Sequence, residues 1–164
     1  YRDIFGNSPE GMWPSEGSLS NEVLTILSNN NLKWAASDEM VLANSMHSDY
    51  KPEYKYFPIQ YKSSTANITL FFRDHNLSDA IGFTYSNWNP KDAATNFVER
   101  LNSIRTQIIN NCGENSLDYA VVPIILDGEN CWEYYAENGV PFLRELFQSI
   151  SNNELVETVL FKID

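Results

Sequence analysis

Ile68-Thr69-Leu70-Phe71-Phe72 decides the fold class, because this run is apolar and β-prone and ends abruptly in Arg73-Asp74-His75. Branched and aromatic side chains favour a buried strand, and the change to charged residues marks where burial stops. Tyr119 to Leu126 is a second such run, almost continuously apolar and closed by Asp127. Strands buried on both faces of a parallel sheet have this pattern. Both runs therefore predict buried parallel strands.

Helical patterns lie around these runs. Asn89 followed by Pro90 is a strong helix start, with Asn as the cap and Pro at the first helical position. The apolar residues that follow on one face are Ala93, Phe97, Leu101, Ile104 and Ile108. A helix is predicted after Ser18, with Leu19, Val23, Ile26 and Leu27 at helical spacing. Another is predicted after Asp38, through Met40, Val41 and Leu42. A last helix is predicted from about Pro141 to Ile150.

The remaining segments complete an alternating pattern. Leu32 to Ala36 and Val156 to Phe161 read as short strands, whereas His47 to Tyr61 is an aromatic-rich connection whose tyrosines suit either core packing or a sugar face. Strands that alternate with helices indicate a parallel α/β architecture, in an open sheet or a barrel. A complete barrel needs roughly 250 residues, so a chain of 164 residues supplies only part of one. We expect one domain over residues 1–164, with about four βα units.

Composition narrows the class of protein. With 43% hydrophobic and 13% aromatic residues, the chain can bury one sizeable core. Its net charge of −11 argues against nucleic acid, whereas a neutral sugar polymer is indifferent to that charge. No apolar run approaches the roughly 18 residues that span a bilayer, so no membrane partner is expected. Cys112 and Cys131 lack CxxC spacing, which disfavours zinc, and they can be paired or reduced.

The N-terminus begins Tyr1-Arg2-Asp3-Ile4-Phe5 and has neither an initiator Met nor an apolar signal-like stretch. The chain therefore looks like part of a longer polypeptide, whose remainder would be its partner. Our expectation for its location is the cytoplasm.

Polar clusters follow three segments at the points where strands are expected to end. They are Trp13-Pro14-Ser15-Glu16, Arg73-Asp74-His75 and Asp127-Gly128-Glu129-Asn130. Because the carboxyl ends of parallel strands open onto one face, these side chains should converge. Two facing carboxylates can split a glycosidic bond, and a nearby indole can pack on a sugar ring. Trp13 and Trp132 lie close to the two candidate carboxylates, although either could instead fill the core.

Three blocks of sequence resemble glycoside hydrolase family 57. The first is Gly11-Met12-Trp13-Pro14-Ser15-Glu16-Gly17-Ser18, and the last is Ile125-Leu126-Asp127-Gly128-Glu129-Asn130 with Trp132-Glu133 behind it. Between them, Phe72-Arg73-Asp74-His75-Asn76-Leu77-Ser78-Asp79 and Ile81-Gly82-Phe83, with Tyr85-Ser86 and Trp88, resemble the amylopullulanase-type members. The resemblance covers nearly the whole chain.

The resemblance implies both a fold and an activity. It implies the C-terminal portion of an incomplete (β/α) barrel of the seven-stranded type, which acts on α-glucans such as starch, glycogen, pullulan and maltooligosaccharides without a cofactor. Glu16 matches the family's nucleophile and Asp127 its general acid/base, in a double displacement through a covalent glycosyl-enzyme. The side chains expected to line the pocket are Trp13, Arg73, Asp74, His75, Asp79, Glu129 and Trp132, although the polar ones could instead support the carboxylates. The family's earlier histidine-containing block and later helical region do not occur here, which puts the activity of the isolated chain in doubt.

Three functional classes stay open at this point. The first is a retaining hydrolase of α-1,4 and possibly α-1,6 linkages, of the α-amylase or amylopullulanase kind, or a transglycosylase or branching enzyme of the same family. The second is a carbohydrate-binding or regulatory module without catalysis, against which the presence of both Glu16 and Asp127 speaks. The third, a metal-dependent deacetylase, would need metal ligands, but the chain has only His47 and His75, so no metal is expected.

Overall fold

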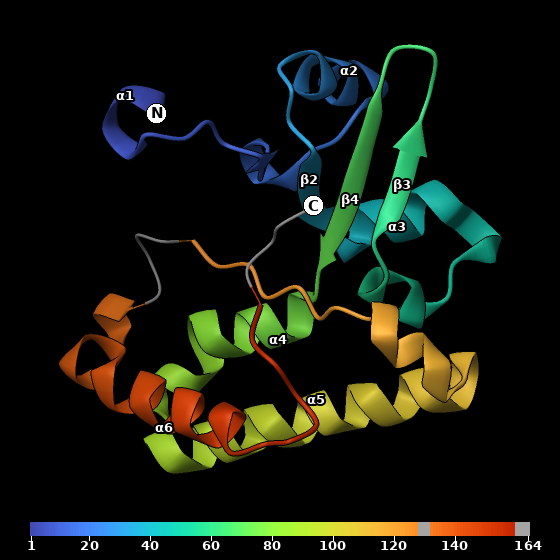
Figure 1. The fold of residues 1–164 in the computed structure, drawn as a ribbon. Coiled ribbons are helices and arrows are strands. Elements are labelled where there is room, and N and C mark those ends of the chain that lie inside the picture. The colour runs from blue at the N-terminus through green and yellow to red at the C-terminus, as the bar shows by residue number, and fades with distance from the viewer. Residues whose placement is uncertain (128–131, 160–164) are drawn as a thin grey trace. The chain divides into compact units, whose positions relative to one another are not determined.

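A computed structural model describes residues 1–127 and 132–159 of the chain. The chain divides into two compact units and passes between them more than once. Unit 1 contains Tyr1–Arg73 and Tyr119–Pro123, and unit 2 contains Asp74–Asp118 and Ile124–Val159. Unit 1 carries the β-sheet, whereas unit 2 is built from helices (Figure 1).

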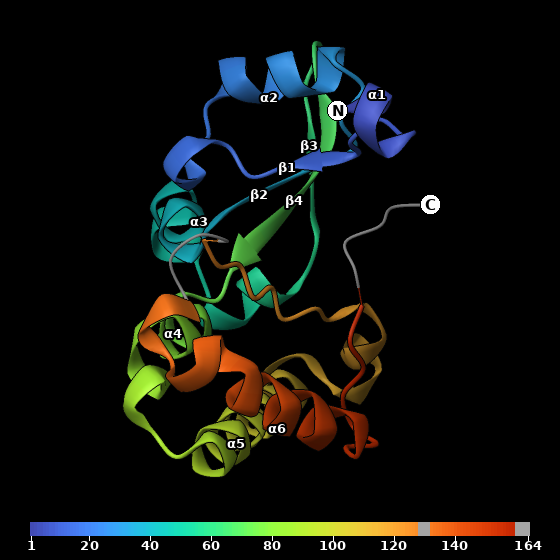
Figure 2. The same cartoon turned by 90° about the vertical axis from the view of Figure 1, so that its left-hand side faces the viewer.

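The sheet of unit 1 has the strand order β1-β2-β4-β3. Figure 2 labels its four strands. The strands β1 (Gly11–Met12), β2 (Trp34–Asp38) and β4 (Asn67–Arg73) are parallel. The strand predicted at residues 68–72 is confirmed as β4. The strand predicted at residues 32–36 is observed as β2, which begins two residues later. However, β3 (Ile59–Lys62) pairs antiparallel with β4. The expectation of an all-parallel sheet was wrong here, because a tight turn, in which the Ser63 backbone N–H donates to the Ala66 carbonyl at 2.8 Å, joins β3 to β4.

The core of unit 1 lies between the sheet and two helices, α2 (Asn21–Asn29) and α3 (Glu39–Met46). Side chains from alternate positions of β4 point to these helices, as the two-residue period of a strand requires. The buried members of this core are Leu24, Leu27, Ala35, Leu42, Ile68, Leu70 and Phe72. Burying one large aliphatic side chain contributes about 1.5–3 kcal/mol to folding, so this cluster is the main reason why α2 and α3 are held on the sheet.

Polar caps begin both of these helices. The Ser20 hydroxyl accepts a hydrogen bond from the Val23 backbone N–H at 3.2 Å, so α2 begins two residues after the position predicted from Ser18. Asp38 caps α3 as predicted, with its Oδ1 accepting from the Met40 N–H at 2.9 Å. A short helix, α1 (Arg2–Phe5), precedes β1, and a single 3-10 turn, η1 (Ser15–Gly17), follows it.

The connection from His47 to Tyr61 is more regular than predicted. It contains two 3-10 turns, η2 (His47–Asp49) and η3 (Pro52–Tyr56), and then enters β3. Its tyrosines at positions 50, 54 and 61 are half-buried against the core, and Tyr56 is buried. Core packing therefore accounts for these four aromatic rings.

Unit 2 consists of helices that pack on one another. A first helix, α4 (His75–Asp79), continues into a π-helical turn, η4 (Ala80–Thr84), and a 3-10 turn, η5 (Tyr85–Asn87). The long helix α5 (Pro90–Cys112) begins as predicted, with the Asn89 side chain accepting from the Lys91 N–H at 3.0 Å. The predicted helix near the C-terminus is confirmed as α6 (Val140–Ser151) and packs along α5. Short 3-10 turns complete the order: η6 (Glu114–Tyr119), η7 (Trp132–Tyr134) and η8 (Ala136–Gly139).

The predicted strand from Tyr119 to Leu126 is wrong, because these residues, all of which the structure describes, end η6 and then continue as irregular chain. Pro123 has no N–H for a ladder, and β4 is already paired with β2 on one edge and with β3 over Asn67–Leu70 on the other. The apolar residues instead pack locally: Pro123 is fully buried and the Val121 N–H donates to the Tyr56 carbonyl at 2.8 Å. The predicted strand at 156–161 is also not seen over 156–159, and its last two positions lie outside the described residues.

The seven-stranded barrel stays a prediction, since the described residues form a mixed α/β arrangement with one four-stranded sheet.

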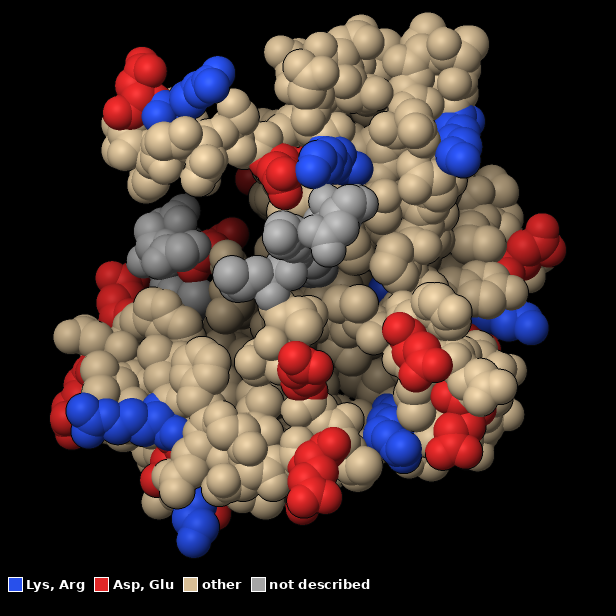
Figure 3. All heavy atoms as spheres, in the orientation of Figure 1, with Lys and Arg blue, Asp and Glu red and all other residues tan. Residues whose placement is uncertain are grey.

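Within the described ranges, no helix is both long and apolar enough to cross a bilayer. On the face drawn in Figure 3, the Lys and Arg side chains stand apart from one another rather than in a patch.

Candidate active site

Glu16 lies in the turn η1 that follows β1, as the sequence predicted for a residue at a strand end. Its backbone is left-handed, with φ 55° and ψ 19°, and Gly17 continues in the same region with φ 65°. Two backbone bonds close the turn, from Gly17 N–H to the Pro14 carbonyl at 2.9 Å and from Ser18 N–H to the Ser15 carbonyl at 3.0 Å. Glu16 is exposed, and these bonds hold it on a sharply bent segment.

A left-handed backbone costs a non-glycine residue roughly 1–2 kcal/mol and persists only where the surroundings impose it. The φ angle alone does not mark a site, since Asn31, His47, Glu137 and Asn138 also have positive values. At Glu16 the surroundings are specific. Gly17 is buried, and a Cβ at that position would lie 2.9 Å from two atoms of the Trp13 indole.

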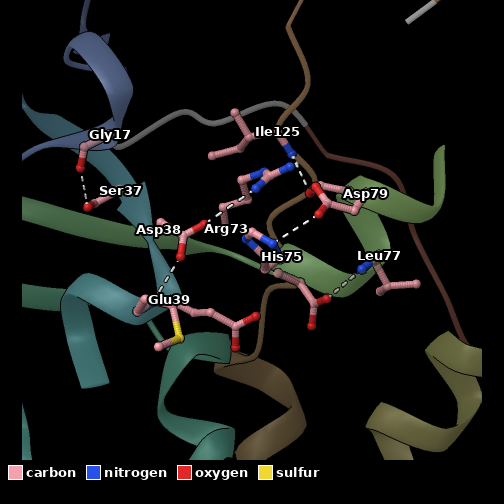
Figure 4. Close-up of polar contacts among 12 residues, drawn as sticks. Gly17, Ser37, Asp38, Glu39, Arg73, His75, Leu77, Asp79 and Ile125 are labelled. Atoms are coloured by element: carbon pink, nitrogen blue, oxygen red, sulfur yellow. Dashed lines mark hydrogen bonds and ion pairs between the residues drawn. The ribbon is translucent and has the colours of Figure 1, made fainter. Parts of the chain in front are cut away.

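The sheet holds this turn through a buried serine. Ser37 of β2 is fully buried, and its hydroxyl donates to the Gly17 carbonyl at 2.5 Å (Figure 4). Trp13, half-buried, packs on the same glycine. The predicted role of Trp13 as a sugar platform stays a prediction, and its observed contact is with the loop that carries Glu16.

Charged side chains occupy the carboxyl ends of the next two strands. Asp38 ends β2 and Arg73 ends β4, and they are register partners in the parallel ladder. Arg73 Nη1 lies 3.4 Å from Asp38 Oδ2, with side-chain exposures of 17% and 20% (Figure 4). Asp38 thus has two tasks, since its other oxygen caps α3. The predicted site residues Arg73 and Glu16 both belong to unit 1. Arg73 is the last residue of β4, and Glu16 lies in the turn after β1.

A second ion pair involves Glu39, the residue after Asp38. Lys55 Nζ is 2.5 Å from Glu39 Oε2, and only 8% and 13% of the two side chains are exposed. The ammonium also lies 5.1 Å from the centre of the Tyr56 ring. A buried pair of this kind costs desolvation of both charges and is retained only where its geometry is good. It connects η3 to the first residue of α3.

In unit 2, the predicted site residues 74, 75 and 79 are gathered on one short helix. Asp74 is buried and caps α4, with Oδ1 accepting from the Leu77 N–H at 2.8 Å. His75 Nε2 lies 2.9 Å from Asp79 Oδ2, one helical turn away, and both side chains are substantially exposed (Figure 4). The cap gives Asp74 a local structural role, and the ion pair gives one to His75 and Asp79. That any of the three lines the pocket stays a prediction.

Asp127 ends the irregular segment that replaces the predicted strand. It is exposed, and two residues before it the Ile125 N–H donates to the hydroxyl of Ser78 at 3.2 Å. Ser78 belongs to α4 and is fully buried. The segment that carries Asp127 is therefore anchored to a helix through a serine, rather than to a sheet through a ladder. Glu129, the other predicted acidic residue here, lies outside the described residues.

Aromatic rings pack where the chain resumes after that gap. The Trp132 ring centre lies 5.6 Å from that of Tyr135, which in turn lies 5.3 Å from Phe142 of α6. The Tyr135 hydroxyl donates to the Ile81 carbonyl, which ties this cluster to η4. A Cβ on Gly139 would come within 2.7 Å of the Trp132 ring. Trp132 is thus half-buried in a packed cluster, and its predicted contact with sugar stays a prediction.

The structure places the predicted residues in two groups. Trp13, Glu16 and Arg73 lie in unit 1, and Asp74, His75, Asp79, Asp127 and Trp132 lie in unit 2. That the carboxyl groups of Glu16 and Asp127 meet across one sugar remains a prediction.

Three residues at the strand ends were not predicted as part of the site, namely Ser37, Asp38 and Glu39. The sequence contained the signal, because these polar residues directly follow the predicted strand at 32–36, just as Arg73 follows the strand at 68–72. Asp38 was interpreted only as a helix cap, which hid its position at the end of β2.

Within residues 1–127 and 132–159, no three His, Cys, Asp or Glu side chains are grouped closely enough to hold an ion. Cys112 is exposed at the end of α5, and Cys131 lies outside the described residues.

Comparison with known proteins agrees with the sequence blocks. No curated protein sequence matches the chain. Among solved structures, the chain is similar to the 4-alpha-glucanotransferase of Thermococcus litoralis, with a TM-score of 0.61 and 21% identity. The match covers 89% of this chain and 20% of the transferase, so the chain spans about a fifth of that protein's length. At this identity the likeness shows the fold alone.

The family model described as glycosyl hydrolase family 57 matches residues 1–162. That range includes the turn with Glu16, the charged edge at Arg73, helix α4 and the segment with Asp127. The chain belongs to glycosyl hydrolase family 57.

Proposed function

We propose that this chain supplies both catalytic carboxylates of an enzyme that cleaves α-glucans with retention, Glu16 as nucleophile and Asp127 as general acid/base. The observation that carries the proposal is the family match over residues 1–162, which includes both motifs. The structure adds support from each unit, since Glu16 is exposed on a constrained turn after a strand and Asp127 is exposed on an anchored segment.

The proposed reaction has two steps. In the first, a Glu16 carboxylate oxygen attacks the anomeric carbon while the Asp127 carboxylic acid gives its proton to the departing glycosidic oxygen. In the second, the Asp127 carboxylate takes a proton from the acceptor hydroxyl, and the acceptor oxygen displaces Glu16 from the anomeric carbon. Retention by this route requires carboxyl groups roughly 5–5.5 Å apart.

The acceptor decides between two activities. With water as acceptor the enzyme is a hydrolase, for which we propose α-amylase or amylopullulanase activity on α-1,4 and possibly α-1,6 linkages. With a sugar hydroxyl as acceptor it is a transferase, and the similar structure from T. litoralis is titled a 4-alpha-glucanotransferase. The reaction needs the same two carboxylates with either acceptor, so we propose the same roles for Glu16 and Asp127 in hydrolysis and in transfer.

The test uses the complete polypeptide that carries this sequence and assays maltooligosaccharides and pullulan. Glu16→Gln and Asp127→Asn should each lower turnover by at least about 10²-fold, since each removes a group that forms or breaks a bond. Glu22→Gln and Asp118→Asn, at exposed positions of units 1 and 2, are matched controls and should retain activity. Turnover within a few fold of wild type for either site variant would refute that residue's role.

Product analysis separates the two activities, and a binding assay separates both from the non-catalytic alternative. Incubation of maltotriose with labelled glucose yields labelled oligosaccharides only if a sugar serves as acceptor. A wild-type protein that binds maltooligosaccharides yet releases no product and forms no labelled oligosaccharide would instead support a carbohydrate-binding module.

A further inference from the structure

Two serines are the most completely buried polar residues that the structure describes. The exposed fractions of Ser37 and Ser78 are both 0%, whereas the other buried polar residues have larger values. Asp74 caps α4 and Lys55 pairs with Glu39, so those two have local explanations. Each serine hydroxyl instead bonds the backbone of a segment that carries a proposed catalytic carboxylate.

The Ser37 bond acts on the residue next to Glu16. Its hydroxyl donates to the Gly17 carbonyl at 2.5 Å, across a sequence separation of 20 residues. Gly17 is buried, so without this bond its carbonyl would lose a partner where water does not easily replace it. The bonded carbonyl belongs to the Gly17–Ser18 peptide, whose Ser18 N–H closes the turn on the Ser15 carbonyl at 3.0 Å, so a shift of this peptide would disturb the turn that carries Glu16.

We infer that Ser37 is a positioning residue, which holds the turn η1 so that the Glu16 carboxylate points at the anomeric carbon. This inference rests on the proposed function. The strand β2 is a suitable support, because Ser37 lies in the ladder with β4 and does not move independently of the sheet. A nucleophile displaced by about 1 Å can lose on the order of 10²-fold in rate.

Ser78 supports the same inference for Asp127 on separate evidence. Its hydroxyl accepts from the Ile125 N–H at 3.2 Å, across 47 residues of sequence. Ile125 is two residues before Asp127, about 7 Å away along an extended chain. Residues 119–126 have no ladder, and this bond holds the part of the segment next to Asp127 on α4. Ser78 is therefore the positioning residue for the general acid/base.

Two substrates distinguish these roles in the complete polypeptide. A maltooligosaccharide has a poor leaving group that needs protonation, whereas α-maltosyl fluoride releases fluoride without an acid. The value of kcat/KM reports formation of the glycosyl-enzyme with both substrates. Ser37→Ala should lower kcat/KM about tenfold or more with both, because the nucleophile is needed in each case. Ser78→Ala should lower kcat/KM about tenfold with the maltooligosaccharide and less than about threefold with the fluoride.

Controls separate positioning from loss of stability. Ser45→Ala and Ser103→Ala remove exposed hydroxyls that donate to backbone carbonyls in units 1 and 2, and should leave kcat/KM unchanged. Leu24→Val and Leu146→Val, at buried positions of helices α2 and α6, destabilise the cores of the two units, so they show what a lower Tm alone does to activity. Ser37→Thr and Ser78→Thr keep the hydroxyl, whereas Ser37→Cys and Ser78→Cys replace it with a thiol that hydrogen-bonds only weakly. Recovery of kcat/KM is expected with threonine and not with cysteine, and recovery with cysteine would show that the hydrogen bond is not what matters.

The outcomes are distinct. If Ser37→Ala lowers Tm but leaves kcat/KM with both substrates within twofold of wild type, Ser37 is only structural and the inference is wrong. If Ser78→Ala affects both substrates equally, its assignment to the acid/base is wrong. Glu16→Gln and Asp127→Asn are measured in parallel, because unchanged activity in those variants would overturn the proposed function itself and not only the role of the serines.

Discussion

The two units support their carboxylates by different means. In unit 1, Glu16 follows a parallel strand, and its turn is bonded to the neighbouring strand through Ser37. In unit 2, Asp127 follows irregular chain that is bonded to a helix through Ser78. A fully buried serine hydroxyl thus bonds each segment, in one case beside a β-ladder and in the other without one. We therefore expect variants in the two units to fail in different ways.

The largest expected effect concerns the carboxylates themselves. Asp127→Asn should lower kcat/KM for maltooligosaccharides by about 10²–10⁴-fold, because it removes proton transfer to the leaving group. With α-maltosyl fluoride the same variant should stay close to wild type. Glu16→Gln should be inactive with both substrates, since no nucleophile remains. Equal loss with both substrates in Asp127→Asn would break the proposed division of roles.

The buried pair of Lys55 and Glu39 gives the next largest effect, on stability. Lys55→Met leaves the Glu39 carboxylate without its ammonium partner and should lower the free energy of unfolding by about 3–5 kcal/mol. Adding Glu39→Leu should restore most of that loss, because no unpaired charge is then buried. Urea denaturation of the single and double variants measures both values. A Lys55→Met protein as stable as wild type would show that the pair is not buried in solution.

Glycines beside tryptophans give a smaller effect in each unit. Gly17 and Gly139 both have a left-handed backbone, and a Cβ added to them would lie 2.9 Å from the Trp13 ring and 2.7 Å from the Trp132 ring. Gly17→Ala and Gly139→Ala should therefore each lower the free energy of unfolding by about 2 kcal/mol. Gly6→Ala has the same left-handed backbone, with φ 75°, but open space around the added Cβ, so it serves as the control for both variants and measures the backbone cost alone. The difference in unfolding free energy between each variant and its control gives the contribution of the contact. A difference of zero would contradict the packing described here.

The smallest effect on stability is expected at His75. Its pair with Asp79 is exposed, and exposed pairs contribute about 0–1 kcal/mol. His75→Gln should therefore change the free energy of unfolding by less than about 1 kcal/mol, while a pocket role predicts roughly tenfold lower kcat/KM. Unchanged kcat/KM for this variant would remove His75 from the proposed pocket.

Much of the local structure was predictable, because local signals decide it. Asn89 and Pro90 begin α5 as expected, and the apolar run before Arg73 forms β4. Such features depend on capping and on the alternation of side chains, which a single sequence displays. The family resemblance likewise depended on residues that stand together in the chain.

The strand predicted at 119–126 failed because a ladder depends on distant partners. Its apolar character was interpreted as burial in a sheet, but the hairpin of β3 already occupies an edge of β4, and Pro123 lacks a donor. The same hairpin was missed because Ile59–Lys62 alternates apolar and polar residues over only four positions and lies within an aromatic segment. The role of Ser37 was beyond prediction for a similar reason, since its partner is 20 residues away.

We propose that Glu16 and Asp127 act on one sugar. A crystal structure of the complete polypeptide, trapped with 5-fluoro-α-glucosyl fluoride, tests this proposal. We expect a covalent bond from the anomeric carbon to a Glu16 carboxylate oxygen, with the Asp127 carboxyl group about 5–5.5 Å from that of Glu16. A sugar bonded to another residue, or an Asp127 carboxyl group beyond reach of the glycosidic oxygen, would contradict it.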